Sequence, residues 1–378
     1  MAAKVTLKTI ADRTGLSVPT VSQILNGRNG NYSSEATRAR VLKAAQELHY
    51  RSNFGYRLMQ GHRTDTAAIF MSTGSVFNES KRRLLLLAML DHLNRDGWAA
   101  YVSTFTPDEE SNVELVRTMI NRGVESIIIC GHPVGASRIE EAIASYGVHC
   151  VGTHPVFSRC VTNGSDLGRA RILDYIIAQA GNDFKVIHTP ANLGAWQSHV
   201  KVLLERYPGK TLEEIAEEFL IRAPAPVPAA GNNWTQDIAA NSRIAGEYAA
   251  GVMAKLLKQR HVPRAVICGS DVYALGCGKC LLAAENAKFR DRILLAGYNN
   301  DPALDHFPLP IISGEDDFTR QAQLLVTRSR DDDPCRIAVP PRIHFRKRSD
   351  SAVFPGWTDE VETLTETQYI NTDMEPTF

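Results

Sequence analysis

The sequence of 378 residues lacks any apolar run near the ~18 residues that a membrane-spanning helix needs. Its first residues also lack the apolar core of a signal peptide, so we expect a cytoplasmic protein with no membrane partner. The seven cysteines are scattered and odd in number, which predicts buried, reduced thiols. Cys277 and Cys280 form a C-x-x-C, but no second pair or histidine set accompanies it, so we favour helix packing over a metal or redox site.

The sequence also lacks the common catalytic and nucleotide-binding motifs. There is no G-x-G-x-x-G after a predicted strand, no P-loop, no G-x-S-x-G and no H-E-x-x-H. Four histidines are isolated in the sequence and are interpreted as structural: His132, His154, His188 and His199. We therefore expect no catalytic residues, no metal, no cofactor and no enzymatic activity.

Residues 6–26 predict two short helices joined by a tight turn. Apolar residues at helical spacing give the first helix a buried face, and Thr6 stands before it as a cap. Gly15 stands where the end of that helix needs a left-handed backbone. Ser17 can cap the second helix, and Pro19 is tolerated because it lies in the first turn. This pattern is typical of a helix-turn-helix, whose second helix enters the major groove of DNA.

A third helix is predicted after Ser34, with Val41, Leu42, Ala45 and Leu48 on its buried face. Its surroundings are basic: the first 63 residues hold ten lysines and arginines against three acids, in a chain whose formal net charge is zero. A basic module of this kind suits the phosphate backbone of DNA. The alternative is an ordinary three-helix bundle with a solvated basic face.

From residue 66 onward, short apolar runs alternate with longer amphipathic segments. Strands are predicted at 66–71, 99–104, 126–130, 149–152, 184–188, 265–269, 292–297 and about 342–346. Helices are predicted between them, for example at 80–95, 109–122, 166–180, 236–259 and 272–285. This alternation predicts βαβ units with parallel sheets, whose ligands bind at the carboxyl ends of the strands.

The chain is therefore divided into four predicted parts: a helix-turn-helix domain (1–50), a linker (51–64), a two-lobed α/β domain (65–346) and an acidic tail (347–378). Residues 349–378 contain seven acids and no lysine or arginine. We expect a disordered, solvating tail. The alternative is a tail that packs on the core or competes with DNA for the basic domain.

The N-terminal segments TIADRTGLSVPTVSQILNG and SSEATRARVLKAAQELHY resemble the LacI/GalR (lactose-repressor) family of bacterial transcription regulators. The resemblance continues more weakly through VICGSDVYALG and ILLAGYNNDP. It implies an all-α helix-turn-helix domain plus a two-lobed, periplasmic-binding-protein-like (type I) α/β core. It also implies a homodimer, or a tetramer of paired dimers, that binds a palindromic operator in double-stranded DNA and a small-molecule effector in the cleft between the lobes.

The resemblance assigns roles to the recognition helix. Val18, Pro19 and Gln23 match positions that read base edges, where glutamine can pair with adenine and the other two can contact a thymine methyl. Five further residues match positions that hold phosphates, which set register without reading sequence: Thr6, Thr20, Ser22, Asn26 and Thr37.

The linker resembles the family's hinge, a short segment that folds on DNA and inserts a leucine from each copy into the minor groove. Met59 matches that leucine, with Leu58 beside it. Ser52 stands in place of a usual proline, and Tyr56 in place of a usual alanine, so the hinge geometry departs from the family's. The expected minor-groove residues are Tyr56, Arg57, Leu58 and Met59.

Five residues are candidate effector contacts. Asp271 matches the aspartate of the family's N-D-x-x-A-x-G and can bind ligand hydroxyls, or it caps the next helix. Trp234 can stack on a sugar or base, or it lies in the core, and Phe77 is a candidate second wall. Asn299 stands where relatives often have an aspartate. Asn192 replaces the arginine that grips the effector in relatives, so the effector is expected to be unusual or absent.

Together these features predict a sequence-specific transcriptional regulator, most simply a repressor. One alternative is a cytosolic small-molecule (sugar) binding protein without a gene-regulatory role, which the basic N-terminal residues argue against. The other is an enzyme fused to a DNA-binding module, which the missing catalytic motifs argue against.

Overall fold

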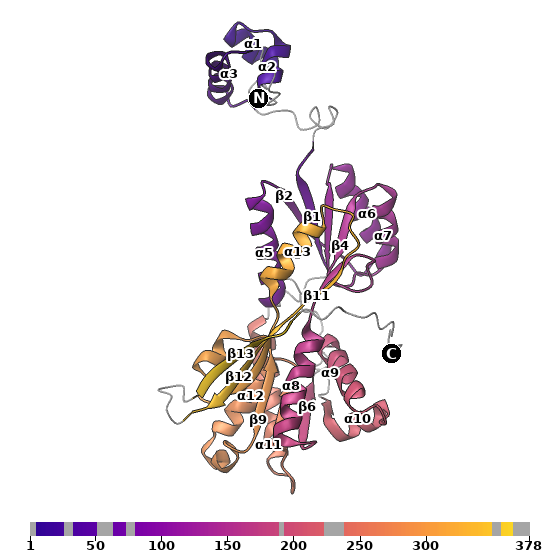
Figure 1. The fold of residues 1–378 in the computed structure, drawn as a ribbon, viewed down its shortest axis with the longest axis vertical. Helices are drawn as coiled ribbons and strands as arrows, with labels where there is room; N and C mark the ends of the chain where they lie inside the picture. Colours follow the sequence, from indigo (N-terminus) through magenta and orange to yellow (C-terminus); the bar gives the residue numbers. More distant parts are fainter. Residues whose placement is uncertain are drawn as a thin grey trace. The chain divides into compact units, whose positions relative to one another are not determined.

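The computed structural model describes residues 5–25, 33–50, 63–72, 80–188, 193–222, 238–349 and 357–365. The chain divides into two compact units, Met1–Thr64 and Asp65–Phe378 (Figure 1). Among the described residues, no helix is both long and apolar enough to cross a membrane.

The first unit is a bundle of three helices, α1 (Leu7–Thr14), α2 (Val18–Leu25) and α3 (Glu35–Glu47). They enclose a small core of Ile10, Ala11, Val21, Ile24, Val41 and Ala44. The predicted burial of Leu42 is wrong, because that side chain is 48% exposed. The buried face of α3 instead follows Val41 and Ala44, with Ala45 and Leu48 packed beside them, and Leu42 lies one position off this stripe.

The second unit contains two sheets, which define two lobes. Lobe one has a six-stranded sheet in the order β11-β5-β4-β3-β1-β2, and all of its strand pairs are parallel. Its strands are β1 (Thr66–Met71), β2 (Ala99–Thr104), β3 (Ser126–Cys130), β4 (His149–Gly152), β5 (Cys160–Asn163) and β11 (Arg336–Val339). Every residue of β1 and β3 is buried, as expected for central strands covered on both faces.

Four helices cover this sheet: α5 (Ser80–Arg95), α6 (Glu109–Asn121), α7 (Ala136–Ser145) and α13 (Phe318–Arg328). One face packs against α5 and α13, and the other packs against α6 and α7. Figure 1 shows α13, which comes from the C-terminal part of the chain, lying beside α5. Lobe one is therefore built from two separate stretches of sequence.

Lobe two has a seven-stranded sheet in the order β13-β12-β10-β9-β8-β6-β7. Its strands are β6 (Phe184–His188), β7 (Leu220–Arg222), β8 (Ala265–Cys268), β9 (Leu294–Tyr298), β10 (Ile311–Glu315), β12 (Arg342–Arg348) and β13 (Trp357–Thr363). The strands from β7 to β10 are parallel, whereas β12 and β13 are antiparallel additions at the edge. The prediction of purely parallel sheets is therefore wrong at this edge.

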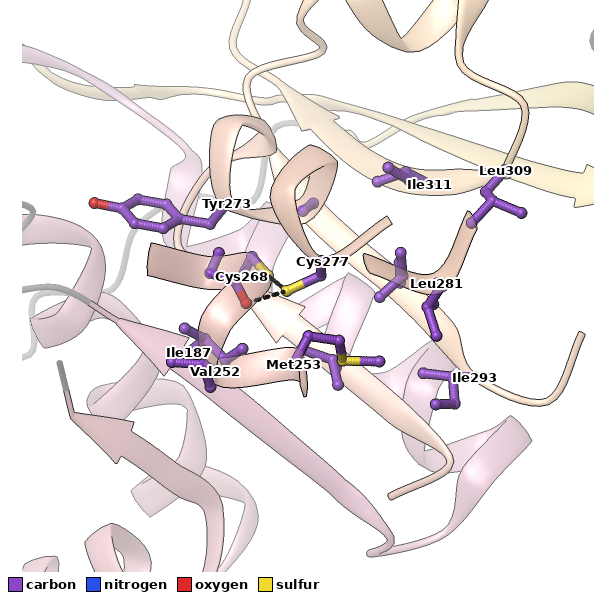
Figure 2. Close-up of a cluster of buried hydrophobic side chains, with 14 of the residues drawn as sticks. Ile187, Val252, Met253, Cys268, Tyr273, Cys277, Leu281, Ile293, Leu309 and Ile311 are labelled. Carbon is purple, nitrogen blue, oxygen red and sulfur yellow. Dashed lines mark hydrogen bonds between the residues drawn. The ribbon is translucent and has the colours of Figure 1, made fainter. Parts of the chain in front are cut away.

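The helical elements of lobe two are α8 (Ser165–Ala180), α9 (Leu193–Arg206), α10 (Leu212–Phe219), α11 (Ile238–Leu256), α12 (Asp271–Leu282), η3 (Ala284–Phe289) and η4 (Pro302–His306). The side of the sheet that packs against α11 and α12 is shown in Figure 2. Cys277 is fully buried there, with its Sγ 4.0 Å from that of Cys268. All seven cysteines are free, and the interpretation of Cys277 as a packing residue is confirmed.

The chain passes between the lobes three times, at residues 163–165, 315–318 and 339–342, which we call the lobe junction. The crossings are joined to one another: the Gly164 N–H donates to the Val339 carbonyl at 2.8 Å, and the Asn163 amide donates to Asp316 at 2.9 Å. Because the strands before the crossings run parallel within their sheets, the junction gathers the carboxyl ends of strands from both lobes.

The prediction of a disordered C-terminal tail is wrong for residues 357–363, which form β13 and pair with all seven residues of β12. Opposite charges hold the two strands together. The ion pairs and hydrogen bonds of the acidic strand are Asp359 with His344 at 2.7 Å, Glu360 with Lys347 at 2.5 Å and Glu362 with Arg171 of α8 at 2.8 Å. The Trp357 indole also donates to the Phe307 carbonyl at 2.9 Å. These acids thus pair with cations of the neighbouring strand β12 and of helix α8.

Truncating the protein after Ser349 is expected to lower its melting temperature by about 4 °C or more. The change removes the pairing of all seven β13 residues and leaves the edge of β12 without a partner, a loss of ~2 kcal/mol that corresponds to about 4 °C in a core of this size. Differential scanning calorimetry on the full chain and the truncated chain measures the shift. An unchanged melting temperature would mean that β13 contributes nothing to the fold.

Candidate DNA-binding surface and ligand site

The three helices of the first unit begin in the same way. A serine or threonine caps each helix and is followed three residues later by a threonine: Thr6 and Thr9, Ser17 and Thr20, Ser34 and Thr37. In these pairs the threonine N–H donates to the capping hydroxyl at 3.3, 3.3 and 3.2 Å. Their hydroxyl oxygens lie 3.1, 2.8 and 2.9 Å apart. The caps fix three helix N-termini, which attract anions such as phosphate.

Three of the predicted phosphate contacts, Thr6, Thr20 and Thr37, belong to these caps. Ser22 is half-buried on α2. Asn26 lies outside the described residues. The turn between α1 and α2 forms as predicted, since Gly15 adopts a left-handed backbone with φ of 68° and donates to the Ala11 carbonyl.

The recognition helix α2 has two distinct faces. Val21 and Ile24 are buried in the core of the bundle. Val18, Pro19 and Gln23, the three predicted base-reading residues, are exposed, and Val18 is 39% exposed. The helix is therefore held by one face while the other is open to a macromolecular partner.

The described part of this unit is predominantly basic at its surface. The exposed cations of its three helices are Lys8, Arg13, Arg38, Arg40 and Lys43. One of them, Arg13, lies 4.0 Å from Glu47, a distance at which two exposed groups interact weakly. The predicted hinge residues Tyr56, Arg57, Leu58 and Met59 lie outside the described residues.

In lobe two, Asp271 ties together the ends of neighbouring strands. It is the first residue of α12 and only 1% exposed. Its carboxylate accepts from the Ser313 hydroxyl at 2.8 and 2.9 Å and from the Asp301 N–H at 2.8 Å. Ser270, not Asp271, occupies the N-cap position. These bonds fix the loop that follows β9.

Asn299 begins that loop in a strained conformation. Its φ is 130°, a region that residues other than glycine rarely adopt. Its N–H donates to the Gly314 carbonyl at 2.7 Å, while its side-chain Oδ1 is buried without a hydrogen-bond partner. The other predicted effector contacts, Phe77, Asn192 and Trp234, lie outside the described residues.

The lobe junction also contains a buried polar cluster that the sequence did not reveal. Tyr298 is fully buried, and its hydroxyl donates to Asp316 at 2.9 Å. Burial and the adjacent Asp316 raise the pKa of Tyr298, which keeps the phenol protonated as a donor. The guanidinium of Arg169 lies over the Tyr298 ring, 4.4 Å from its centre. Burial lowers the pKa of Arg169, partly offset by Tyr298 and nearby aspartates.

His132 and His154 are not isolated in space, contrary to the sequence interpretation. They follow the neighbouring strands β3 and β4, and their rings stack with centres 4.6 Å apart. His199 is buried in α9, and the side chain of His188 lies outside the described residues. The stacked pair lies at the edge of the lobe-one sheet where the strands have their carboxyl ends.

The two units together define a class: a helix-turn-helix transcriptional regulator with a two-lobed core like that of periplasmic binding proteins. Residues 6–53 match the family model "Bacterial regulatory proteins, lacI family". The chain is 30% identical over 131 residues to the sucrose operon repressor of Lactococcus lactis subsp. lactis, which covers 34% of this chain and 39% of the relative. It is 23% identical over 368 residues to the transcriptional repressor PurR of Escherichia fergusonii, covering 90% and 96%.

Solved structures share the fold. The lac repressor dimer bound to operator and the anti-inducer ONPF matches with a TM-score of 0.66 at 17% identity, covering 86% of this chain and 92% of that one. A solute-binding protein of an ABC transporter from Bacillus halodurans C-125, with bound myo-inositol, matches with a TM-score of 0.51 at 16% identity, covering 75% and 95%. The chain is a LacI-family transcription regulator.

Proposed function

We propose that this protein is a cytoplasmic repressor that binds a near-palindromic operator as a homodimer and responds to a small-molecule effector. The observation that carries the DNA-binding part is the exposure of Val18, Pro19 and Gln23 on one face of α2, whose other face is locked in the core. A recognition helix has to be rigid and free on one face in this way.

Gln23 carries most of the direct base reading in this proposal. Its amide can donate and accept together, which matches the edge of adenine in the major groove. Val18 and Pro19 have no hydrogen-bonding side-chain groups, so they contribute contact with thymine methyls or exclude other bases. The capped helix N-termini and exposed cations hold the phosphates on either side.

An apolar surface on lobe one supports the homodimer. Leu84 and Leu87 of α5 are 57% and 63% exposed, and Tyr101 and Val102 of the edge strand β2 are 42% and 45% exposed. Since α5 packs against β2, these side chains belong to adjoining elements. Exposed apolar residues grouped on adjoining elements are typical of an interface. A homodimer places two recognition helices on two half-sites related by a two-fold axis.

The effector part rests on the lobe junction. The carboxyl ends of β8, β9 and β10 carry Asp271, Asn299 and Asp316 there, at the edge where α/β sheets bind ligands. A ligand that contacts both lobes would favour one angle between them and so alter the spacing of the two DNA-binding units. Ligand binding at the lobe junction would in this way change the affinity for the operator.

A gel-shift experiment separates this proposal from the alternative of a sugar-binding protein without a regulatory role. Full-length protein is mixed with a pool of short genomic fragments in excess random competitor DNA. The proposal expects a small set of fragments to shift at nanomolar protein. Equal, weak shifting of all fragments would contradict it and favour the alternative.

The hinge gives a further prediction. Met59→Ala and Leu58→Ala are each expected to weaken operator binding about 10-fold and to reduce bending, because loss of an apolar wedge removes the contact that holds a kinked base step open. Ser52→Ala, in the same linker, serves as the control. Circular-permutation gel shifts report the bend, and unchanged affinity and bending in both variants would exclude a wedge.

A further inference from the structure

Arg169 is a buried cation without an ion pair in the part of the chain that the structure describes. Two arginines there are more than nine-tenths buried, Arg169 at 6% exposed and Arg346 at 3%. Arg346 pairs with Asp305 at 3.0 Å, whereas Arg169 forms no ion pair with any carboxylate of the described residues. Within the described ranges its guanidinium makes one hydrogen bond, a long one of 3.5 Å from Nη1 to the Gly269 carbonyl, and its Nε has no partner there.

The carboxylates that surround Arg169 are engaged elsewhere. The negative charges of Asp166, Asp271 and Asp316 raise the pKa of Arg169. Each accepts hydrogen bonds from other groups: Asp316 from Tyr298 and Asn163, Asp271 from Ser313 and the Asp301 N–H, and Asp166 from Ser198 and Lys201. Arg169 is therefore balanced in charge without being satisfied in hydrogen bonding.

Such an arrangement is unfavourable for the fold alone. A buried guanidinium needs hydrogen-bond acceptors to replace water, and a donor left without one destabilises the folded state. Buried polar groups without partners concentrate at functional sites, where a ligand, an ion or an ordered water completes the set. Arg169 lies at the carboxyl ends of β8 and β9, because it contacts Gly269 and the Tyr298 ring.

The residue after Tyr298 offers the complementary group. Asn299 has a buried Oδ1 without a hydrogen-bond partner, and its backbone is strained at φ of 130°. One donor without a partner, Arg169 Nε, and one acceptor without a partner, Asn299 Oδ1, therefore belong to residues next to Tyr298 at the same edge of the sheet. A ligand that bonds to both groups needs an acceptor for Arg169 and a nearby donor for Asn299.

We propose that the effector is a small carboxylate with a neighbouring hydroxyl or amino group, that is, a hydroxy acid or an amino acid. The carboxylate accepts hydrogen bonds from Arg169, and the neighbouring group donates to Asn299 Oδ1. Three aspartates lie around Arg169 and Lys201, so a ligand with a second negative charge, such as a phosphate ester, is disfavoured. The inference rests on the effector site of the proposed function and specifies its ligand.

The test compares carboxylates with the alcohols that differ from them only at the carboxyl carbon. The pairs are D-gluconate with D-glucitol, L-lactate with propane-1,2-diol, and L-threonine with L-threoninol, each at 10 mM with the full-length protein. We expect at least one carboxylate to raise the melting temperature by 2 °C or more and to bind at least 10-fold more tightly than its alcohol by calorimetry. Arg169→Gln is expected to abolish that preference, and Arg169→Lys to reduce it.

A structural role alone would make different predictions. Arg169→Gln would then lower the melting temperature of the free protein but leave the ratio of carboxylate to alcohol affinity unchanged, which overturns the proposal. Arg169→Lys keeps the buried charge and serves as the test if Arg169→Gln does not fold. If Arg169→Lys binds carboxylates over alcohols with the wild-type ratio, the proposal is also overturned. The absence of stabilisation by every carboxylate overturns it as well.

Different results would contradict the carboxylate ligand and the proposed repressor function. A neutral alcohol or sugar that binds and alters the gel shift would overturn the carboxylate ligand and leave an effector-controlled repressor intact. Carboxylate binding through Arg169, in a protein that shifts no specific DNA fragment, would support the ligand and overturn the repressor.

Discussion

Replacing Gln23 with alanine is expected to weaken binding to the operator by at least about 30-fold, while binding to unrelated DNA stays the same. A good bidentate contact between a side chain and a base contributes ~1–3 kcal/mol, and a dimer would lose one in each half-site. Contacts to unrelated DNA come from cations and helix N-termini, which this change leaves in place. Fluorescence anisotropy with the operator and a scrambled duplex, at fixed salt, measures both affinities.

The chain offers a matched control for this experiment. Gln46 is exposed on α3, outside the recognition helix, and Gln46→Ala removes the same side chain. It is expected to change neither affinity. Because Gln23 is also exposed, its loss should leave the melting temperature unaltered. Equal weakening on both duplexes would assign Gln23 to phosphate contact instead of base reading.

Leu87→Asp, combined with Leu84→Asp, is expected to convert the dimer to monomers and to weaken operator binding by 100-fold or more. Both side chains lie on the exposed face of α5, and burying unpaired carboxylates in an interface costs several kcal/mol. A monomer contacts only one half-site and loses the second set of contacts. Analytical ultracentrifugation measures the assembly state and anisotropy measures the affinity.

Val134→Asp controls for the introduction of charge on an exposed apolar position. Val134 is 50% exposed and precedes α7, which covers the other face of the sheet from α5. The variant is expected to remain dimeric with unchanged affinity. A dimer that persists in the doubly substituted α5 variant would place the interface elsewhere.

The regular parts of the fold could be predicted from the sequence because local pattern determines them. The runs at 66–71, 99–104 and 126–130 form strands with those bounds, since each is apolar or β-prone and is followed by a helix. The short strands β5, β7, β10 and β11 were missed. β10 contains a glycine, and the others have only three or four residues each, too few to show an alternating pattern of their own.

β13 was missed for a different reason. A run of acids without nearby cations in sequence is typical of a solvated tail. Its partners Lys347, His344 and Arg171 lie on β12 and on a distant helix, so only the folded sheet brings the charges together. Charge complementarity between β12 and the tail was the signal that could have revealed the pairing.

Some residues of the candidate sites could be predicted from local sequence pattern, and others could not. The exposure of Gln23 follows from helical spacing and could be predicted. Arg169 gave no signal, because an arginine on an amphipathic helix is usually solvated and its burial depends on tertiary packing over Tyr298. The stacking of His132 on His154 could have been inferred, since each stands two residues after one of two successive predicted strands, and successive strands are usually adjacent.

In the proposed complex a symmetric dimer reads a DNA sequence through α2. Selection of bound duplexes from a random pool, followed by sequencing, measures that reading without assuming an operator. We expect an enriched inverted repeat with an adenine at one position of each half-site, and a loss of preference at that position alone in Gln23→Ala. Failure to enrich any sequence, or enrichment of a single unrepeated site, would contradict it.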